Sequence, residues 1–336
     1  MAGKRKLKSL PCIDPQEIRV FSGGSHPALA AGIARYLAVP LDDTYTKHFS
    51  NDNLYVQLGA SVRERIVYIV QSLTPPASDH LLELLMMLDI ARGAAAKAVH
   101  AIIPYFSFAR SDKKDAPRIS ITARLIADLL QTAGATHVMT MSLHSPQVHG
   151  FFGVPTDPLT ARGLFVRHFR RHFRKKDLRD TVVIAPDAGR SKSAGRFAAH
   201  LDLPVIAAEK TRISEKEVRI SNLVGKQVMG FRRAIIYDDE IATGGSILAV
   251  SELLIRNGIE EITTVCTHGV FTGKSVERLS AIPQITEIVT TDTVPIPPDK
   301  RAPHMKVLSV APVFGEAIRR NYFRQSIGDL FSFWDE

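Results

Sequence analysis

Short runs of β-branched and other apolar residues recur along the chain, and segments with a helical spacing of apolar positions lie between many of them. The predicted strands are Ile18–Phe21, Val67–Gln71, Val99–Pro104, Val138–Leu143, Val182–Pro186, Ala234–Tyr237, Ile262–Thr267, Glu287–Thr291 and Met305–Val310. The predicted helices are Pro27–Leu37, Asp79–Ala91, Ile119–Ala133, Ser191–His200, Gly244–Asn257 and Phe314–Tyr322. A repeated order of strand and helix is typical of parallel sheets covered by helices on both faces.

The alternation of strands and helices is interrupted once. Four strand–helix units are followed by a basic segment near residues 162–180, after which the series starts again. The chain has 336 residues, about twice the commonest domain size, which also favours two compact units. We therefore predict two α/β domains with a boundary near residue 160.

The composition is that of an ordinary globular protein. Apolar residues make up 45% and charged residues 23%, which argues against a mainly disordered, collagen-like or coiled-coil chain. Cys12 and Cys266 are too few for a disulfide framework or a zinc cluster, so a reducing compartment is expected. No run approaches the roughly 18 apolar residues that a membrane helix needs. We expect a soluble cytoplasmic protein without a membrane partner.

The net charge of +9 is unevenly distributed. Residues 162–180 carry eight Lys/Arg and two Asp, a net +6, and four cations among the first eight residues leave the remainder of the chain at −1. Within the basic segment, Phe165, Phe169 and Phe173 recur at the spacing of one helical face. This pattern favours an amphipathic surface helix that packs its phenylalanines on the protein, with anion or partner binding as an alternative. We expect no nucleic-acid partner.

The segment Ala234–Ser246 carries the richest chemistry. An apolar strand ends in Asp238 and Asp239, and a turn of small residues then opens a helix. Glycines let successive backbone N–H groups converge on an anion, while Thr243 and Ser246 add hydroxyl donors at a helix N-terminus. The pattern predicts a phosphate cradle with two carboxylates placed to accept the hydroxyls of a pentose. The alternative is an ordinary capped turn, for which two adjacent carboxylates are an unusual choice.

Two other glycine patterns point away from nucleotide motifs. The stretch from Gly269 to Ser275 has three residues between its glycines where a nucleotide P-loop needs four, so it is interpreted as a plain loop. No G-x-G-x-x-G follows a predicted strand, which removes support for a dinucleotide site.

The stretch DDEIATGGS is the signature of type I phosphoribosyltransferase folds, and ordered stretches elsewhere narrow the resemblance. Among them are FSGGSHPALA, HFSNDNLYVQLGASVR, AIIPYFSFARSDKKD, SLHSPQVHGFF, VIAPDAGRSKSA, AAEKTRIS, VCTHGVFTG and KVLSVAPVFGEAIRR. From about Arg19 to Phe331 the chain resembles the ribose-phosphate diphosphokinase family, also called the PRPP synthetase family. The resemblance implies two tandem phosphoribosyltransferase-like domains with parallel sheets, residues 1–160 and 161–305, and a segment 306–336 that returns to the first domain.

The same resemblance implies a reaction. The β,γ-diphosphate of ATP is transferred to the C1 hydroxyl of ribose 5-phosphate, which gives PRPP and AMP for nucleotide biosynthesis, with Mg²⁺ as cofactor. Because the attack occurs at a polyanionic phosphorus, cations and fixed donors must surround the transferring group. The family commonly assembles as hexamers, so a homo-oligomer is expected.

Matching positions imply the following roles. The metal positions are His144 and Asp187, and the catalytic cations are Lys210 and Arg212. Ribose 5-phosphate is expected at Arg212, Asp238, Asp239, Ala242, Thr243, Gly244, Gly245 and Ser246. ATP is expected at Arg110 and Ser111, with Phe49, Asn51, Asp52 and Asn53 reaching it from a neighbouring subunit. An aromatic face suits stacking on adenine, and short amides can read the edge of the base.

Several positions depart from the commonest forms of the family. Asn51-Asp52-Asn53 stands where Asp-Gly-Glu is common, Ser111 where Gln is common, and Ser142 and Ala242 each where Asp is common. Two alternatives to an active diphosphokinase therefore remain, a catalytically silent regulatory subunit and a phosphoribosyltransferase that consumes PRPP. The retained set of charged site residues favours the active enzyme.

Overall fold

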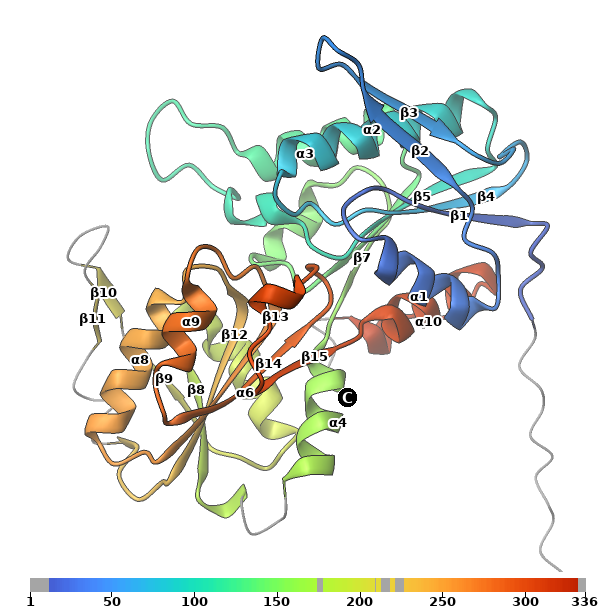
Figure 1. The fold of residues 1–336 in the computed structure, drawn as a ribbon. Helices are drawn as coiled ribbons and strands as arrows, with labels where there is room; N and C mark the ends of the chain where they lie inside the picture. The colour runs from blue at the N-terminus through green and yellow to red at the C-terminus, as the bar shows by residue number, and fades with distance from the viewer. Residues whose placement is uncertain (1–11, 174–177, 209, 213–217, 221–226, 332–336) are drawn as a thin grey trace, which may run out of the picture.

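The computed structural model describes residues 12–173, 178–208, 210–212, 218–220 and 227–331. Two parallel sheets dominate these residues, and they lie beside each other with helices on both faces of each (Figure 1). No helix in these ranges is both long and apolar enough to span a membrane.

The first sheet has the strand order β1-β4-β5-β6-β7, with every pairing parallel. Its strands are β1 (Ile18–Ser22), β4 (Ile66–Val70), β5 (Ala98–Ile103), β6 (His137–Met141) and β7 (Thr156–Leu159). Helix α1 (Pro27–Leu37) covers one face, and α2 (Ala77–Gly93) and α3 (Thr122–Ala133) cover the other (Figure 1). The strands are apolar runs buried on both sides, which is what a doubly covered sheet requires.

The second sheet has the order β15-β14-β13-β12-β8-β9, again parallel throughout. Its strands are β8 (Thr181–Ala185), β9 (Val205–Ala207), β12 (Arg233–Ile241), β13 (Glu261–Gly269), β14 (Ile285–Thr291) and β15 (Met305–Leu308). One face packs on α4 (Arg162–His172) and α6 (Ser191–Ala199), and the other on α8 (Gly245–Arg256) and α9 (Ser275–Ser280).

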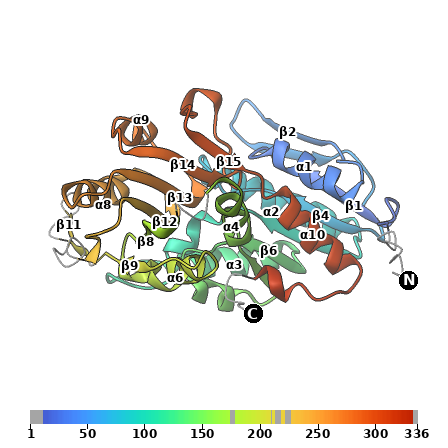
Figure 2. The ribbon, with the colours of Figure 1, turned by 90° about the horizontal axis from the view of Figure 1, so that it is seen from below.

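The last helix, α10 (Ala311–Tyr322), leaves the second sheet and packs against α1 of the first (Figures 1 and 2). The two helices approach closely at Gly315, where an added Cβ would lie 2.3 Å from the ring of Tyr36. A side chain at position 315 would therefore push the helices apart. Helix α10 thus returns to the unit that contains α1.

Two short hairpins stand apart from the sheets. Strands β2 (Thr44–His48) and β3 (Leu54–Leu58) form an antiparallel ribbon that projects from the first unit, and β10 (Lys210–Arg212) pairs with β11 (Val218–Ile220) (Figure 1). The described 3₁₀ turns are Ser107–Arg110, Pro146–Phe151, Ala188–Arg190, Pro298–Lys300 and Gly328–Leu330.

One apolar cluster extends across both sheets, whereas the other face of each sheet has a cluster of its own. One cluster of buried residues includes α1 and α10 beside the first sheet and α4 and α6 beside the second. Within it, Phe165 and Phe169 of the basic helix are fully buried and Phe173 is partly buried. The amphipathic interpretation of this helix is confirmed, although α4 ends at His172 and is shorter than the basic run.

All nine predicted strands and all six predicted helices are present, with ends shifted by a few residues. The strands that the prediction missed are β2, β3, β7, β9, β10 and β11, and α9 was also missed. The stretch after Gly269 is a loop, as predicted, but its last residue, Ser275, begins α9.

Candidate active site

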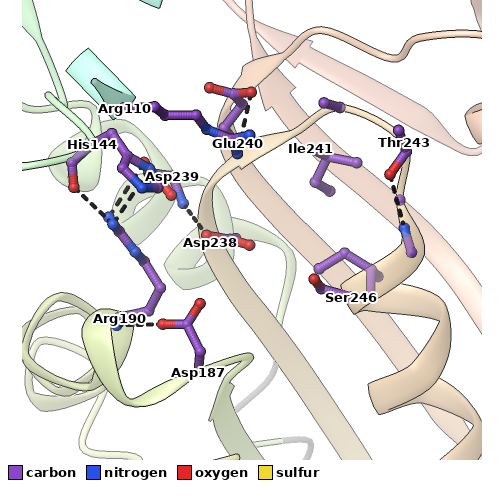
Figure 3. A pocket seen from close by; sticks show the side chains of 14 residues that line it. Arg110, His144, Asp187, Arg190, Asp238, Asp239, Glu240, Ile241, Thr243 and Ser246 are labelled. Carbon is purple, nitrogen blue, oxygen red and sulfur yellow. Dashed lines mark hydrogen bonds and ion pairs between the residues drawn. The ribbon is translucent and has the colours of Figure 1, made fainter. Parts of the chain in front are cut away.

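The carboxyl ends of β8 and β12, neighbours in the second sheet, face that of β6 in the first sheet where the two sheets meet. Parallel strands place the residues that follow them at the same edge of a sheet, which is where open α/β sheets bind ligands. These ends surround a cavity of about 440 Å³ (Figure 3). It is lined by Arg110, His144, Asp187, Arg190, Asp238, Asp239, Glu240, Ile241, Ala242, Thr243, Gly244, Gly245, Ser246 and Ile247.

Three consecutive carboxylates near the carboxyl end of β12 have different partners. Asp238 Oδ1 accepts a hydrogen bond from the backbone N–H of Asp239 at 2.8 Å. Asp239 Oδ2 lies 2.7 Å from His144 Nδ1 and 3.2 Å from an Arg190 nitrogen. Burial and the adjacent Asp239 carboxylate raise the pKa of Asp238. Burial opposes ionisation of Asp239 too, but the hydrogen bond from His144 and the charge of Arg190 outweigh it and lower the pKa of Asp239.

Asp187 and Arg190 occupy the turn that follows β8. Asp187 Oδ1 accepts a hydrogen bond from the Arg190 backbone N–H at 3.0 Å, so the carboxylate caps the turn. The Arg190 guanidinium extends away from this cap and donates to the backbone carbonyl of His144 at 2.7 Å. Since His144 follows β6 of the first sheet, Arg190 joins the two units at the cavity (Figure 3).

Glu240 makes a second bridge between the sheets. Its carboxylate lies 3.3 Å from an Arg110 nitrogen and accepts a hydrogen bond from the Tyr105 hydroxyl at 3.2 Å. The Glu240 side chain is only 6% exposed, and burial raises its pKa, an effect that Arg110 partly offsets. Burial raises the pKa of Tyr105, and the negative charge of the nearby Glu240 adds to this effect.

Deeper in the junction, His268 of β13 is fully enclosed. Burial lowers its pKa to about 4, so the ring is neutral near pH 7. With Nε2 as donor, it reaches the Met141 carbonyl at 3.1 Å, while Nδ1 lies 2.9 Å from the Thr293 hydroxyl. Nearby, Thr267 Oγ1 donates to Ser142 Oγ at 3.2 Å. These contacts fix the ends of β6 and β13 relative to each other.

The predicted phosphate cradle forms the far wall of the cavity. Gly244 has a φ of 75°, a left-handed conformation that favours glycine, and α8 begins at the next residue. The N-terminus of a helix favours anions through its dipole and its first backbone N–H groups. At the start of α8, the Gly245 N–H donates to Thr243 Oγ1 at 3.5 Å. Thr243 and Ser246 bring their hydroxyls to the same cavity.

Comparisons with known proteins agree with this geometry. A model of the N-terminal domain of ribose phosphate pyrophosphokinase matches residues 18–134, and a model of the phosphoribosyl synthetase-associated domain matches residues 210–332. A ribose-phosphate pyrophosphokinase of Deinococcus radiodurans is 45% identical over 93% of this chain and 97% of its own length. That of Clostridium acetobutylicum is 39% identical over 94% and 98%. The chain belongs to the ribose-phosphate pyrophosphokinase family.

A solved structure supports the assignment to this family. The phosphoribosylpyrophosphate synthetase of Mycobacterium smegmatis superposes with a TM-score of 0.84 at 35% identity, over 92% of this chain and 99% of that one. The predicted α/β fold with two phosphoribosyltransferase-like parallel sheets is confirmed. The predicted function and enzyme class, a ribose-phosphate diphosphokinase, are confirmed as well. No comparison favours a silent regulatory subunit.

The structure brings most of the predicted site residues to one cavity. Those that line it are Arg110, His144, Asp187, Asp238, Asp239, Ala242, Thr243, Gly244, Gly245 and Ser246. Lys210 and Arg212 belong to strand β10. The structure describes the backbone of this strand but not these two side chains. Ser111 does not line the cavity; its hydroxyl accepts from the Thr122 N–H at 3.2 Å and donates to the Ser120 carbonyl, which closes the loop before α3.

The predicted adenine-binding segment lies at the tip of the β2–β3 hairpin. Phe49 and Asn53 pair there, with the Phe49 N–H 2.9 Å from the Asn53 carbonyl. Asp52 has a φ of 65°, at the position where the family commonly has glycine. Phe49 is 48% exposed. Its ring meets Tyr55 edge-on, with Lys47 Nζ 5.0 Å from the ring centre. This tip does not line the cavity of its own chain.

Sequence reasoning missed Arg190, Glu240, Tyr105 and His268. For Glu240 the signal was present, because it is the third of three consecutive carboxylates at a strand end. For Arg190 the only signal was its place three residues after Asp187 in a predicted loop. Tyr105 and His268 act between the sheets, and no local pattern reveals that.

Proposed function

We propose that the cavity at the ends of β6, β8 and β12 is where this chain transfers the β,γ-diphosphate of ATP to the C1 hydroxyl of ribose 5-phosphate. The observation that carries this proposal is the meeting of three features on one cavity. The α8 N-terminus suits a phosphate, Asp238 and Asp239 suit the hydroxyls of a sugar, and Arg110 stands at the mouth. A substrate that extends from the α8 N-terminus to the two aspartates would carry both a phosphate and a pentose.

In this proposal the 5-phosphate of the pentose binds the backbone N–H groups of Gly244 to Ser246 and the Thr243 hydroxyl. A phosphate held in this way needs no carboxylate at position 242, so Ala242 is compatible with binding. Asp238 and Asp239 accept hydrogen bonds from the ring hydroxyls. Asp239 Oδ2 is held by His144 and Arg190, which fixes the orientation of the carboxylate toward the sugar.

ATP is proposed to lie on the Arg110 side of the cavity. Arg110 is half exposed, and the Glu240 carboxylate holds it at the mouth. The exposed Phe49 ring, with Asn51, Asp52 and Asn53 beside it, is proposed to reach the adenine of a neighbouring copy. This arrangement requires a homo-oligomer, and the family's hexamer is the proposed assembly.

The donor set of the cavity fits a divalent cation, for which we propose Mg²⁺. The lining residues carry four carboxylates and two guanidinium groups, a formal net charge of −2, although the substrates are polyanions. His144 can donate Nδ1–H to Asp239, which leaves Nε2 as a ligand and is the usual support of a metal-bound histidine. Asp187 would supply an oxygen. Among the described residues no group of three His, Cys, Asp or Glu side chains is placed to hold a metal ion, so water and substrate phosphates would have to complete the coordination of Mg²⁺.

When bound, the metal neutralises charge on the phosphates. Lys210 and Arg212, two residues apart on the extended strand β10, are proposed to add cations that stabilise the diphosphate during transfer. The chain itself orients the C1 hydroxyl through Asp238 and Asp239, and the buried junction around His268 excludes water behind them.

The organisation of the chain is also proposed. Residues 1–160 and 161–305 are proposed as the two domains, with 306–336 returning to the first. The passage from β7 of one sheet to α4 beside the other supports the boundary, and the packing of α10 on α1 supports the return. Because ATP and ribose 5-phosphate are cytoplasmic metabolites, we propose that the enzyme works in the cytoplasm.

The decisive experiment incubates the protein with ATP, ribose 5-phosphate and Mg²⁺ and measures AMP and PRPP. Stoichiometric formation of both is expected. Lys210→Ala should lower turnover strongly and leave the affinity for ribose 5-phosphate little changed, because it acts on charge that develops during transfer. A wild-type protein that forms no AMP would overturn the proposal.

A further inference from the structure

Arg190 lines the cavity and contacts segments that belong to both sheets. Its guanidinium donates to the His144 carbonyl at 2.7 Å and lies 3.2 Å from Asp239 Oδ2, and its side chain is 14% exposed. His144 follows β6 of the first sheet, whereas Asp239 lies near the carboxyl end of β12 in the second. One planar group therefore contacts both sides of the junction in the wall of the cavity (Figure 3).

The local turn does not need this side chain. Asp187 caps the turn through the backbone N–H of residue 190, which any residue except proline supplies. The guanidinium instead extends from the turn to the segment after β6. Its position is therefore explained by what it holds in the cavity and not by the stability of the turn.

The charge of the cavity gives the second part of the argument. Of its two guanidinium groups, Arg110 is 51% exposed and Arg190 is 14% exposed. Water screens the charge of the first much more than that of the second. Within the described lining, Arg190 is thus the buried permanent cation, set among carboxylates in a cavity proposed to receive phosphates.

We propose that Arg190 is a positioning residue that locks His144 to Asp239 across the junction and serves as a resident cation of the diphosphate site. The inference rests on the proposed function and extends it. A guanidinium has five N–H donors in a fixed plane, so two acceptors on different segments hold that plane while the remaining donors reach a phosphate oxygen. The resident charge reduces the concentration of free divalent cation that the enzyme needs.

The test compares Arg190→Ala and Arg190→Lys with Arg232→Ala as a matched control. Arg232 also pairs with a carboxylate, Glu260, but it lies on the surface at the opposite end of β12. For Arg190→Ala we expect turnover to fall about 100-fold and the Mg²⁺ concentration for half-maximal rate to rise about tenfold, equivalent to about 2.7 and 1.4 kcal/mol. Arg190→Lys keeps the positive charge but loses the planar set of guanidinium donors. Its Mg²⁺ requirement should therefore stay within about threefold of that of wild type, while its turnover still falls.

A second measurement needs neither a metal ion nor catalytic turnover. Binding of inorganic diphosphate is measured by calorimetry in the presence of EDTA, where Arg190→Ala should bind about tenfold more weakly than wild type and Arg232→Ala should bind as wild type does. Added guanidinium, kept well below denaturing concentrations, should restore part of the rate of Arg190→Ala. A merely structural residue would lower the melting temperature without these effects.

The outcomes separate this inference from the proposed function. An active wild type together with an Arg190→Ala variant of unchanged Mg²⁺ requirement and unchanged diphosphate binding would overturn the role of Arg190 alone. A wild type that makes no AMP would overturn the proposed function, whereas weaker metal-free diphosphate binding by Arg190→Ala would still support the resident cation.

Discussion

Adjacent residues at the end of β12 serve opposite sides of the cavity. Asp239 is tied to His144 and Arg190, next to the proposed sugar site, whereas Glu240 holds Arg110 at the proposed ATP site. Because successive side chains of a strand point to opposite sides, neighbouring residues can serve different substrates. This arrangement allows two similar substitutions to be compared in one experiment.

We predict crossed effects for the two neutral variants. Asp239→Asn weakens charge-assisted hydrogen bonds near the sugar, so it should raise the KM for ribose 5-phosphate about tenfold or more and change that for ATP less. Glu240→Gln should do the reverse, because it loosens Arg110. Steady-state kinetics with each substrate varied in turn provide the test. Equal effects on both substrates from each variant would contradict these assignments.

The same residues show how far sequence reasoning reaches at this scale. Asp238, Asp239 and the cradle were predictable, because they follow one strand directly and their geometry is local. The contact between Asp239 and Arg190 was not predictable from the sequence. Arg190 lies 49 positions before Asp239, and the two side chains meet only because β8 pairs with β12. Residues that act between two sheets leave no periodic signal in the sequence.

At the scale of elements, prediction succeeded where burial imposed a pattern. The nine predicted strands are apolar because helices cover both faces of their sheets. Strand β2 is mostly exposed and β3 has one buried residue, so neither carries this signal. Strand β7 contains Pro158, which is unusual within a strand and is tolerated here at the edge of its sheet. Helix α9 is six residues long, too short for a helical period to appear.

Helix α4 is rich in basic residues, but its buried phenylalanines give it a role in packing. Phe169 is fully buried between α4, α6 and the second sheet, whereas Arg171 on the same helix is exposed. We expect Phe169→Ala to lower the free energy of unfolding by about 3–5 kcal/mol because it empties a packed site. Arg171→Ala should change it by about 0.5 kcal/mol or less. Urea unfolding of both variants is the measurement, and equal small losses would contradict the packing role of the phenylalanine face.

The α1–α10 pair carries a charge network that should make stability depend on pH. Glu316 accepts hydrogen bonds from Arg319, Arg320 and the Tyr36 hydroxyl. The bond from Arg319, with help from Arg320 and Tyr36, lowers the pKa of Glu316 to about 2. A carboxyl whose pKa is lower when folded stabilises the fold above its usual pKa of 4.5 and loses that contribution as the pH falls toward 2.

Glu316→Gln should therefore cost about 1 kcal/mol at pH 7, a modest value because solvent screens part of the network. The difference between wild type and variant should shrink as the pH is lowered from 4.5. Urea midpoints at several pH values between 7 and about 3 would measure it, as far as both proteins remain folded. A difference that stayed constant across this range would mean that ionisation of Glu316 does not support the helix pair.

At the scale of the whole molecule, two sheets with separate strand orders are joined by apolar and polar contacts. A single apolar cluster continues from α1 and α10 to α4 and α6, and polar contacts cross the junction at His144, Glu240 and His268. Ser72 Oγ adds a hydrogen bond of 2.6 Å to the Thr293 carbonyl. Such a shared core couples the unfolding of one sheet to that of the other.

We predict that the two sheets unfold in one transition and that a ligand of the second sheet alone stabilises both. Ribose 5-phosphate, proposed to bind the cradle of the second sheet, should raise the free energy of unfolding of the whole chain by about 2.7 kcal/mol at 100 times its Kd. Hydrogen exchange during urea unfolding can follow β4 and β5 separately from β12 and β13, and circular dichroism reports on both sheets together. If ribose 5-phosphate protects β12 and β13 while β4 and β5 still exchange at the ligand-free midpoint, the sheets unfold independently and the continuous core does not couple them.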